Sequence, residues 1–223
     1  MEQPLFSFII ACQEDGTNRE FLRRCLDSIH RQSCQDFEVL VCHRGEAPTE
    51  AGTSAKLRHV KAEDDALRDL GIREARGEYL IHLTAEDLLY DYALDTIIKT
   101  MQTPRRKIRI DEATGQYLET LKEQADPADT GIYIFSIINV GVECDGINFW
   151  MNAQNDRRYG MVLTGRPAIP QILAVMQMAI RRDLWLRYGG WYDKSANGHG
   201  EMYARFVAEN WSRCVPAILG EHW

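Results

Sequence analysis

Short apolar runs alternate with amphipathic stretches through roughly the first hundred residues, and this alternation constrains the fold more than any other feature of the sequence. The runs are residues 6–11, 38–42 and 79–83, which is typical of strands buried on both faces. Between them, residues 22–29 carry apolar side chains at the spacing of one helix face, and residues 64–75 are predicted to form a helix that Gly77 closes. Strands that alternate with helices predict parallel βαβ units, and hence an α/β fold with a mostly parallel sheet flanked by helices.

Beyond residue 103 the alternation becomes irregular. The stretch 103–130 is polar and mixed, so we interpret the basic run at 105–109 as a solvated loop and expect short helical content at 117–124. The remaining predicted elements are strands at 131–142 and 171–180, a short helix at 183–188 stopped by two glycines, and a last helix around Phe206.

Composition narrows the class of protein. The 223 residues suffice for one buried core, and the net charge of -7 argues against a nucleic-acid binder, which usually carries a basic face. None of the six cysteines forms a Cys-x-x-Cys pair, and no apolar segment approaches the roughly 20 residues that cross a bilayer. The first residues lead straight into a strand-like run and do not resemble a secretory signal. We therefore expect a reduced, cytoplasmic protein.

Ligands of parallel α/β sheets bind beyond the carboxyl ends of the strands, so the loops after Ala11, Cys42 and Leu83 are the candidate binding loops. The third of these contains Glu86 and Asp87, whose oxygens could hold a hard divalent cation that bridges a diphosphate. The alternative is that the two acids only complement the dipole of a following helix.

Isolated residues are weaker signals. His222 could complete a metal shell or be an ordinary surface histidine, and Arg68 could bind phosphate or lie on a solvated helix face. The tryptophans could form a platform for a sugar ring, although tryptophans more often belong to the core; the candidates are residues 149–151, Trp185, Trp191 and Trp211.

Three stretches together resemble a family-two glycosyltransferase of the A-type fold. Residues 6–41 resemble its opening strand, helix and second strand, and residues 66–80 resemble its Ala-Arg-Asn-x-Gly-Ile-x-x-Ala-x-Gly-Glu-Tyr run. Residues 181–201 resemble its Gly-Gly-Phe-Asp segment and the Gly-Glu-Asp motif that follows. The resemblance implies one domain, 1–223, with a nucleotide-binding half at 1–102 and an acceptor half at 103–223 whose variable region is 103–170.

The resemblance also implies an activity: inverting transfer of a sugar from a nucleotide diphosphate sugar, with Mn²⁺ or Mg²⁺. The acceptor would be a glycan, a lipid-linked molecule or a protein, as in polysaccharide biosynthesis, and peripheral membrane association would be compatible with it. By position, the resemblance implies these site residues: Ala11, His43, Arg44, Arg68 and Glu86 near the nucleotide, Glu86, Asp87 and His222 at the metal, and Glu201 as candidate base.

The sequence departs from the family at three acidic positions. The first acid of the Asp-x-Asp-Asp loop is Thr84, and the Asp-Asp-Gly-Ser segment is His43-Arg44-Gly45-Glu46. The acid of the Gly-Glu-Asp motif, the expected general base, is Met202, whose thioether cannot accept the hydroxyl proton. Three alternatives therefore stand beside an active enzyme with Glu201 as base: a degenerate, non-catalytic binding module, a domain of a longer protein, and another nucleotide-dependent transferase.

Overall fold

The computed structural model describes residues 3–12, 19–49, 54–62, 66–103, 105–110, 117–123, 130–140, 175–191, 206 and 210–223. Within these ranges an eight-stranded sheet has the order β3-β2-β1-β4-β9-β8-β10-β5, and β6 and β7 form a separate two-stranded sheet. No helix in the described ranges is both long and apolar enough to cross a membrane.

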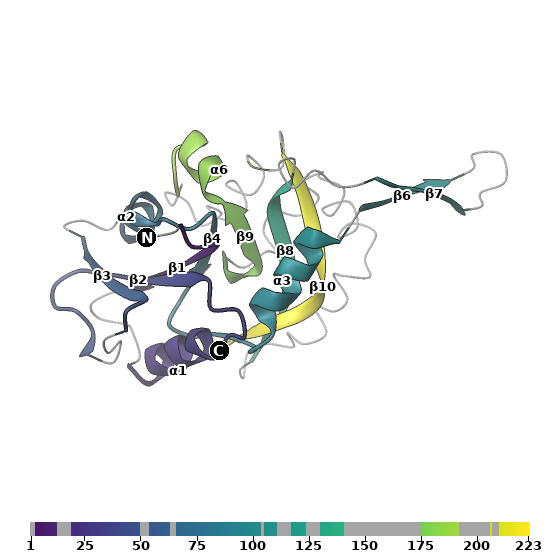
Figure 1. Ribbon diagram of the computed structural model, residues 1–223. Helices are drawn as coiled ribbons and strands as arrows, with labels where there is room; N and C mark the ends of the chain where they lie inside the picture. The colour runs from purple at the N-terminus through teal and green to yellow at the C-terminus, as the bar shows by residue number, and fades with distance from the viewer. Residues whose placement is uncertain are drawn as a thin grey trace.

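The amino-terminal half follows the predicted βαβ pattern (Figure 1). Its elements are β1 (Phe6–Cys12), α1 (Arg19–His30), β2 (Phe37–His43), β3 (Leu57–Lys61), α2 (Leu67–Glu74), β4 (Tyr79–Leu83), β5 (Asp87–Leu89) and α3 (Ala93–Gln102). Strand β1 pairs in parallel with both β2 and β4, and β2 pairs in parallel with β3. The parallel arrangement brings the carboxyl ends of these strands to one edge of the sheet, where a ligand is expected.

The second half completes the sheet with both orientations. Its elements are β6 (Arg105–Ile110), β7 (Tyr117–Glu123), β8 (Thr130–Asn139), a 3₁₀ turn (Val175–Gln177), β9 (Met178–Arg181), α6 (Arg182–Arg187) and β10 (Trp211–His222). Strand β9 runs antiparallel to β4 and β8, whereas β10 runs parallel to β8 and antiparallel to β5. The sheet is therefore mixed, with its parallel part concentrated around β1.

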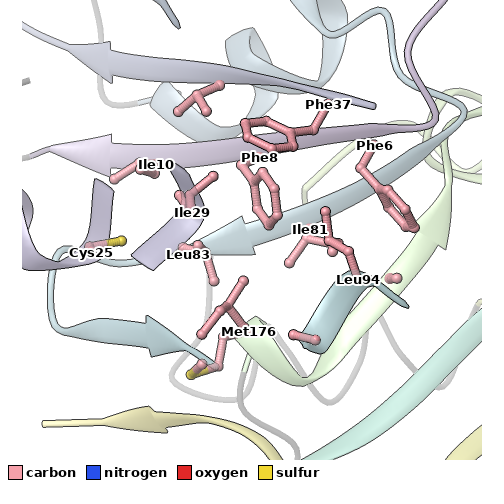
Figure 2. Close-up of a cluster of buried hydrophobic side chains, with 14 of the residues drawn as sticks. Phe6, Phe8, Ile10, Cys25, Ile29, Phe37, Ile81, Leu83, Leu94 and Met176 are labelled. Carbon is pink, nitrogen blue, oxygen red and sulfur yellow. The ribbon is translucent and has the colours of Figure 1, made fainter. Parts of the chain in front are cut away.

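Apolar side chains cover both faces of the sheet. One buried cluster joins α1 and α3 to residues such as Phe8, Ile81 and Leu83 (Figure 2). The other joins α2 and α6 to the opposite face through residues such as Ile9 and Leu80. Because alternate side chains of a strand point to opposite faces, Phe8 and Ile9 enter different clusters, which explains why these strands read as continuous apolar runs.

Two expectations for the irregular region were wrong. Residues 117–124 were expected to have helical content and 105–109 to be a loop, yet β6 and β7 pair as antiparallel strands from Arg105 opposite Glu123 to Ile110 opposite Tyr117. The residue pattern of each segment alone does not indicate that it pairs with the other. Pairing forms hydrogen bonds between the backbone groups of the two strands. Figure 1 shows this hairpin extending away from the main sheet.

The other differences are smaller. The predicted strand at 171–180 corresponds, in its described part, to the 3₁₀ turn and β9. The predicted helix at 183–188 is α6, and it ends before Gly189 and Gly190, which both have φ of 84°. That left-handed conformation is accessible to glycine without steric cost, as the helix-stop prediction required. Strand β10 was not predicted, although it carries His222.

Candidate functional site

The site begins with the pairing of β10 and β5. These strands run antiparallel, with His222 opposite Asp87 and Glu221 opposite Leu88. The preceding strand, β4, ends at Leu83, so the short turn from Thr84 to Glu86 delivers Asp87 to the carboxyl edge of the sheet. Two of the three residues predicted as metal ligands therefore come together although 135 positions separate them in the chain.

Asp87 is a buried carboxylate with two defined partners. Only 2% of the residue is exposed. Its Oδ2 accepts a hydrogen bond from the backbone N–H of Thr84 at 2.6 Å, and its Oδ1 lies 2.7 Å from Nδ1 of His222. A buried carboxylate needs such partners, because burial of an unpaired charge is strongly unfavourable. The turn and the histidine together fix the orientation of this carboxylate.

His222 responds to that carboxylate. The hydrogen bond with Asp87 raises the pKa of the His222 imidazole; burial opposes the rise, while the charges of Asp87 and Glu86 add to it. The side chain of His222 is 43% exposed and that of Asp87 is 3% exposed, so the pair is open to ligands on the histidine side. A protonated His222 forms an ion pair with Asp87, whereas a neutral His222 can offer a ring nitrogen to a metal ion.

The donor set partly fits a divalent cation. No three His, Cys, Asp or Glu side chains in the described ranges form a group that could hold a metal ion. Asp87 and His222 supply two adjacent donors, and such a set leaves the remaining positions to diphosphate oxygens and water. An imidazole donor suits Mn²⁺ better than Mg²⁺, which prefers oxygen. The Glu86 side chain does not complete a three-residue set, although its backbone oxygen accepts the N–H of Trp223 at 3.1 Å.

Cys25 of α1 lies on the buried side of this site. Burial raises the pKa of the Cys25 thiol well above its usual value, and the charges of Asp87, Cys12 and Glu86 raise it further. The thiol is therefore neutral at ordinary pH and behaves as a small apolar side chain rather than as a thiolate ligand.

The residues expected at the nucleotide lie at the ends of β1 and β2. Ala11 is half-buried and pairs with Cys42, one residue before His43. His43 is 5% exposed, with its ring 5.6 Å from that of His59 and its Nδ1 3.3 Å from the backbone oxygen of Arg44. Arg44 is half-buried. These positions flank the carboxyl edge, as predicted, while contact with a nucleotide stays a prediction.

Arg68 lies in the first turn of α2. Helix α2 returns the chain from β3 to β4, so its amino-terminal end faces the carboxyl edge of the parallel strands. The Arg68 guanidinium lies over the ring of Trp191, with Cζ 4.7 Å from the centroid. The neighbouring Asp69 accepts the backbone N–H of Trp191 through Oδ1. Helix α2 therefore holds the turn that follows α6, an arrangement that the sequence patterns did not indicate.

Other predicted site residues either lie outside the described residues or occupy positions that differ from the prediction. Glu201 lies outside the described residues, as do Phe149, Trp150 and Met151, and nothing is described of the Trp211 side chain. Trp185 and Trp191 are 1% and 7% exposed and stack on each other at 5.5 Å, so they belong to the core rather than to a sugar platform. Trp223, which is 43% exposed beside His222, was not among the predicted candidates. Its position directly after a proposed ligand was the available signal.

Comparison with known proteins places this geometry in context. No family model matches the sequence. The putative glycosyltransferase EpsH of Bacillus subtilis (strain 168) is 26% identical over 110 residues, which are 45% of this chain and 31% of that protein. The chain thus spans about a third of the length of this relative.

Solved structures match over nearly the whole chain. S. aureus TarS 1–349 has a TM-score of 0.65 at 12% identity, covering 97% of this chain and 60% of that one. The mannosyltransferase PcManGT from Pyrobaculum calidifontis, in complex with GDP-Man and Mn²⁺, has a TM-score of 0.62 at 16% identity, covering 99% and 57%. TarS 1–349 in complex with UDP-GlcNAc has a TM-score of 0.60 at 12% identity, covering 97% and 57%. At these identities the likeness concerns the fold, and it confirms that this chain has the predicted A-type glycosyltransferase fold.

Proposed function

We propose that this protein is a metal-assisted, inverting glycosyltransferase that uses a nucleotide diphosphate sugar as donor. The observation that carries the proposal is the pairing of buried Asp87 with His222, 2.7 Å apart, at the carboxyl edge of a glycosyltransferase-type sheet. Carboxylate and imidazole donors at the edge where α/β folds bind ligands would suit a cation that bridges a diphosphate.

The solved structures support this choice of donor. PcManGT has a solved structure in complex with GDP-Man and Mn²⁺, and TarS 1–349 has solved structures in complex with UDP and with UDP-GlcNAc. The Bacillus subtilis relative is itself named as a putative glycosyltransferase. We therefore propose the nucleotide diphosphate sugars as the donor class, with a hydroxyl of a glycan, a lipid-linked molecule or a protein as acceptor.

Each candidate residue has a distinct role in this proposal. Asp87 and His222 would hold the cation, and His222 would do so only as neutral imidazole, so binding releases its proton. A cation held by Asp87 and His222 would supply positive charge that stabilises the leaving diphosphate. His43, Arg44 and Arg68, together with the backbone near Ala11, would orient the nucleoside and its phosphates. Glu86 would add negative charge beside the cation.

The transfer itself would be a single displacement. The acceptor hydroxyl would attack the anomeric carbon as the bond to the diphosphate breaks, which inverts the configuration at that carbon. Glu201 is our candidate for the base that takes the hydroxyl proton, since its neighbour Met202 cannot. The diphosphate leaves with both electrons of the broken bond.

Calorimetric titration with UDP and GDP, with and without Mn²⁺, tests the donor proposal. We expect one nucleotide to bind in a metal-dependent manner and Asp87→Asn to lose that dependence. Glu20→Gln is the matched control, because Glu20 is an exposed acid that pairs with Arg23 on α1. Equal metal-dependent binding by Asp87→Asn and wild type would remove Asp87 from the site, and no binding by wild type would remove the donor proposal.

A non-catalytic binding module is the second candidate, and Met202 is the observation that favours it. Turnover separates the two, because only an enzyme releases nucleotide from a bound sugar donor. We expect Glu201→Gln to lower turnover without weakening donor binding. Met202→Asp restores an acid at the family's base position and should raise turnover if Met202 occupies that place. Donor binding without any turnover, unaltered by Met202→Asp, would favour the binding module.

A further inference from the structure

Trp223 has a large aromatic side chain that is partly exposed to water next to the candidate metal ligand His222. It directly follows His222 in the sequence, and 43% of its surface is accessible. The buried tryptophans Trp185 and Trp191 show that this fold has room for indole rings in its core. A large aromatic side chain left in water beside a binding site is more informative than an isolated exposed aliphatic residue.

The ring of Trp223 is held in one orientation. Its Nε1–H donates to Oε2 of Glu221 at 3.0 Å, and its backbone N–H donates to the oxygen of Glu86 at 3.1 Å. The guanidinium of Arg24, from α1, lies over the ring with Cζ 4.8 Å from the centroid, a favourable cation–π arrangement. A ring fixed before a ligand arrives loses little conformational entropy on binding.

Glu221 links this ring to a second aromatic group. Its Oε1 accepts the hydroxyl hydrogen bond of Tyr90 at 2.8 Å, while its Oε2 accepts from Trp223. Burial raises the pKa of Tyr90 to about 12, with the bond to Glu221 adding to the rise, so the phenol keeps its proton and remains a donor. The neighbouring Tyr92 is 51% exposed, with its ring 5.7 Å from that of Tyr90. Tyr90, Glu221 and Trp223 therefore form one hydrogen-bonded group at the carboxyl end of β10, next in the chain to His222.

The sheet order indicates which part of a donor this group faces. Strands β1 and β2, where the nucleoside is expected, lie on one side of β4, whereas β10 and β5 lie on the other. A diphosphate held at Asp87 and His222 would have its nucleoside toward β1 and β2. The sugar and the acceptor would then lie toward Trp223.

We propose that Trp223, oriented by Arg24 and Glu221, is a stacking platform for a sugar ring beside the candidate metal site. The proposal rests on the glycosyltransferase function proposed above. One face of many pyranose rings carries C–H groups, which pack on the negative face of an indole, and carboxylate oxygens such as those of Glu221 accept hydrogen bonds from sugar hydroxyls. The ring could belong to the donor sugar or to the terminal sugar of the acceptor.

Titration of Trp223→Ala tests the platform and separates these two sources. The probes are UDP and GDP, the sugar donors UDP-GlcNAc and GDP-mannose, and methyl glycosides of the same sugars added after the nucleotide, all with Mn²⁺. We expect the nucleoside diphosphate to bind as in wild type. A donor ring on Trp223 predicts roughly tenfold weaker binding of the sugar donor, and an acceptor ring predicts a similar loss for the methyl glycoside alone.

Two further variants control for folding and for general surface effects. Trp223→Phe keeps an aromatic face and should retain most of the sugar affinity. Leu186→Ala removes another exposed apolar side chain, 48% exposed on α6, and should change none of the affinities.

Three outcomes would overturn the platform. Unchanged sugar affinities in Trp223→Ala, with nucleotide binding intact, would reject the platform alone. An equal loss for UDP or GDP and for their sugar donors would assign Trp223 to the nucleotide instead. Wild-type protein that binds no nucleoside diphosphate would reject the proposed function and, with it, the platform.

Discussion

Nδ1 of His222 lies 2.7 Å from Oδ1 of Asp87, although 135 positions separate the two residues in the chain. The contact exists because β10 runs antiparallel to β5 and aligns these two residues. It joins a carboxylate that is almost fully buried to an imidazole that is partly open to solvent. Such a pair couples protonation, stability and metal binding in one place.

The first prediction concerns the protonation of His222. The hydrogen bond with Asp87 is the largest cause of the raised pKa, so Asp87→Asn should lower the pKa of His222 toward its ordinary value of 6.5. NMR titration of the imidazole signals measures this change, and His222→Gln identifies which of the six histidines is involved. An unchanged His222 titration in Asp87→Asn would mean that the pair does not form in solution.

The second prediction is the dependence of stability on pH. The folded-state pKa of His222 is raised above the unfolded value of 6.5, so the protonated form stabilises the fold. This stabilisation is complete below pH 6.5, as long as Asp87 stays ionised, and is lost as the pH rises through the folded-state pKa. The size is modest because the side chain of His222 is 43% exposed and solvent screens the pair.

Urea unfolding of wild type and His222→Gln across this range measures the effect. The difference in the free energy of unfolding between the two proteins should shrink as the pH increases. A difference that grows with pH would reverse the assigned sign and contradict the ion pair.

Sequence patterns predicted the fold and named Asp87 and His222 as candidate metal ligands, but they did not predict that the two side chains contact each other. The parallel half is visible because each of its strands is a local apolar run, such as residues 79–83. Strand β10 contains Pro216 and shifts register on both sides of Ile218, so it lacks the regular alternation of a typical strand. Its pairing with β5 is set by tertiary contacts, and so are the burial of Asp87 and the position of Trp223. No local pattern contains that information.

The third prediction concerns Glu38, which has no role in the proposed reaction and instead contributes to stability. This buried side chain accepts hydrogen bonds from Ser7 Oγ at 2.7 Å and from the backbone N–H of Arg76 at 2.5 Å, and its other oxygen lies 3.2 Å from Nη2 of Arg58. It therefore joins β1, β2 and β3 to the residues that precede β4. Removal of the carboxylate deprives the buried Ser7 hydroxyl and the partly buried N–H of Arg76 of this acceptor, which costs more than the bonds themselves contribute.

We expect Glu38→Ala to lower the free energy of unfolding by about 2–4 kcal/mol. Glu20→Ala is the control, since Glu20 pairs with Arg23 on the exposed surface of α1 and its loss should have no measurable effect. Chemical denaturation of both variants gives the comparison. Equal stability of the two variants would show that the buried network contributes little.

The fourth prediction concerns Gly71, at the centre of α2. Alanine normally stabilises a helix relative to glycine by about 1 kcal/mol. Here a Cβ at residue 71 would lie 2.3 Å from Cγ2 of Ile9 and 3.0 Å from Sγ of Cys42, because α2 packs directly on β1 and β2. The overlap must push the helix away from the sheet, and overpacking of this kind costs about 1–3 kcal/mol. We therefore expect Gly71→Ala to destabilise the fold despite its better helix propensity.

A double-mutant cycle with Ile9→Ala identifies the cause. Ile9→Ala removes the clashing methyl group and leaves a cavity, so each single variant should be less stable than wild type. The double variant should lose less than the sum of the two single losses, because the new methyl group occupies part of the space that Ile9 leaves. Additive losses would place the cost of Gly71→Ala elsewhere than in its contact with Ile9. A stabilised Gly71→Ala would mean that α2 sits farther from the sheet than the structure has it.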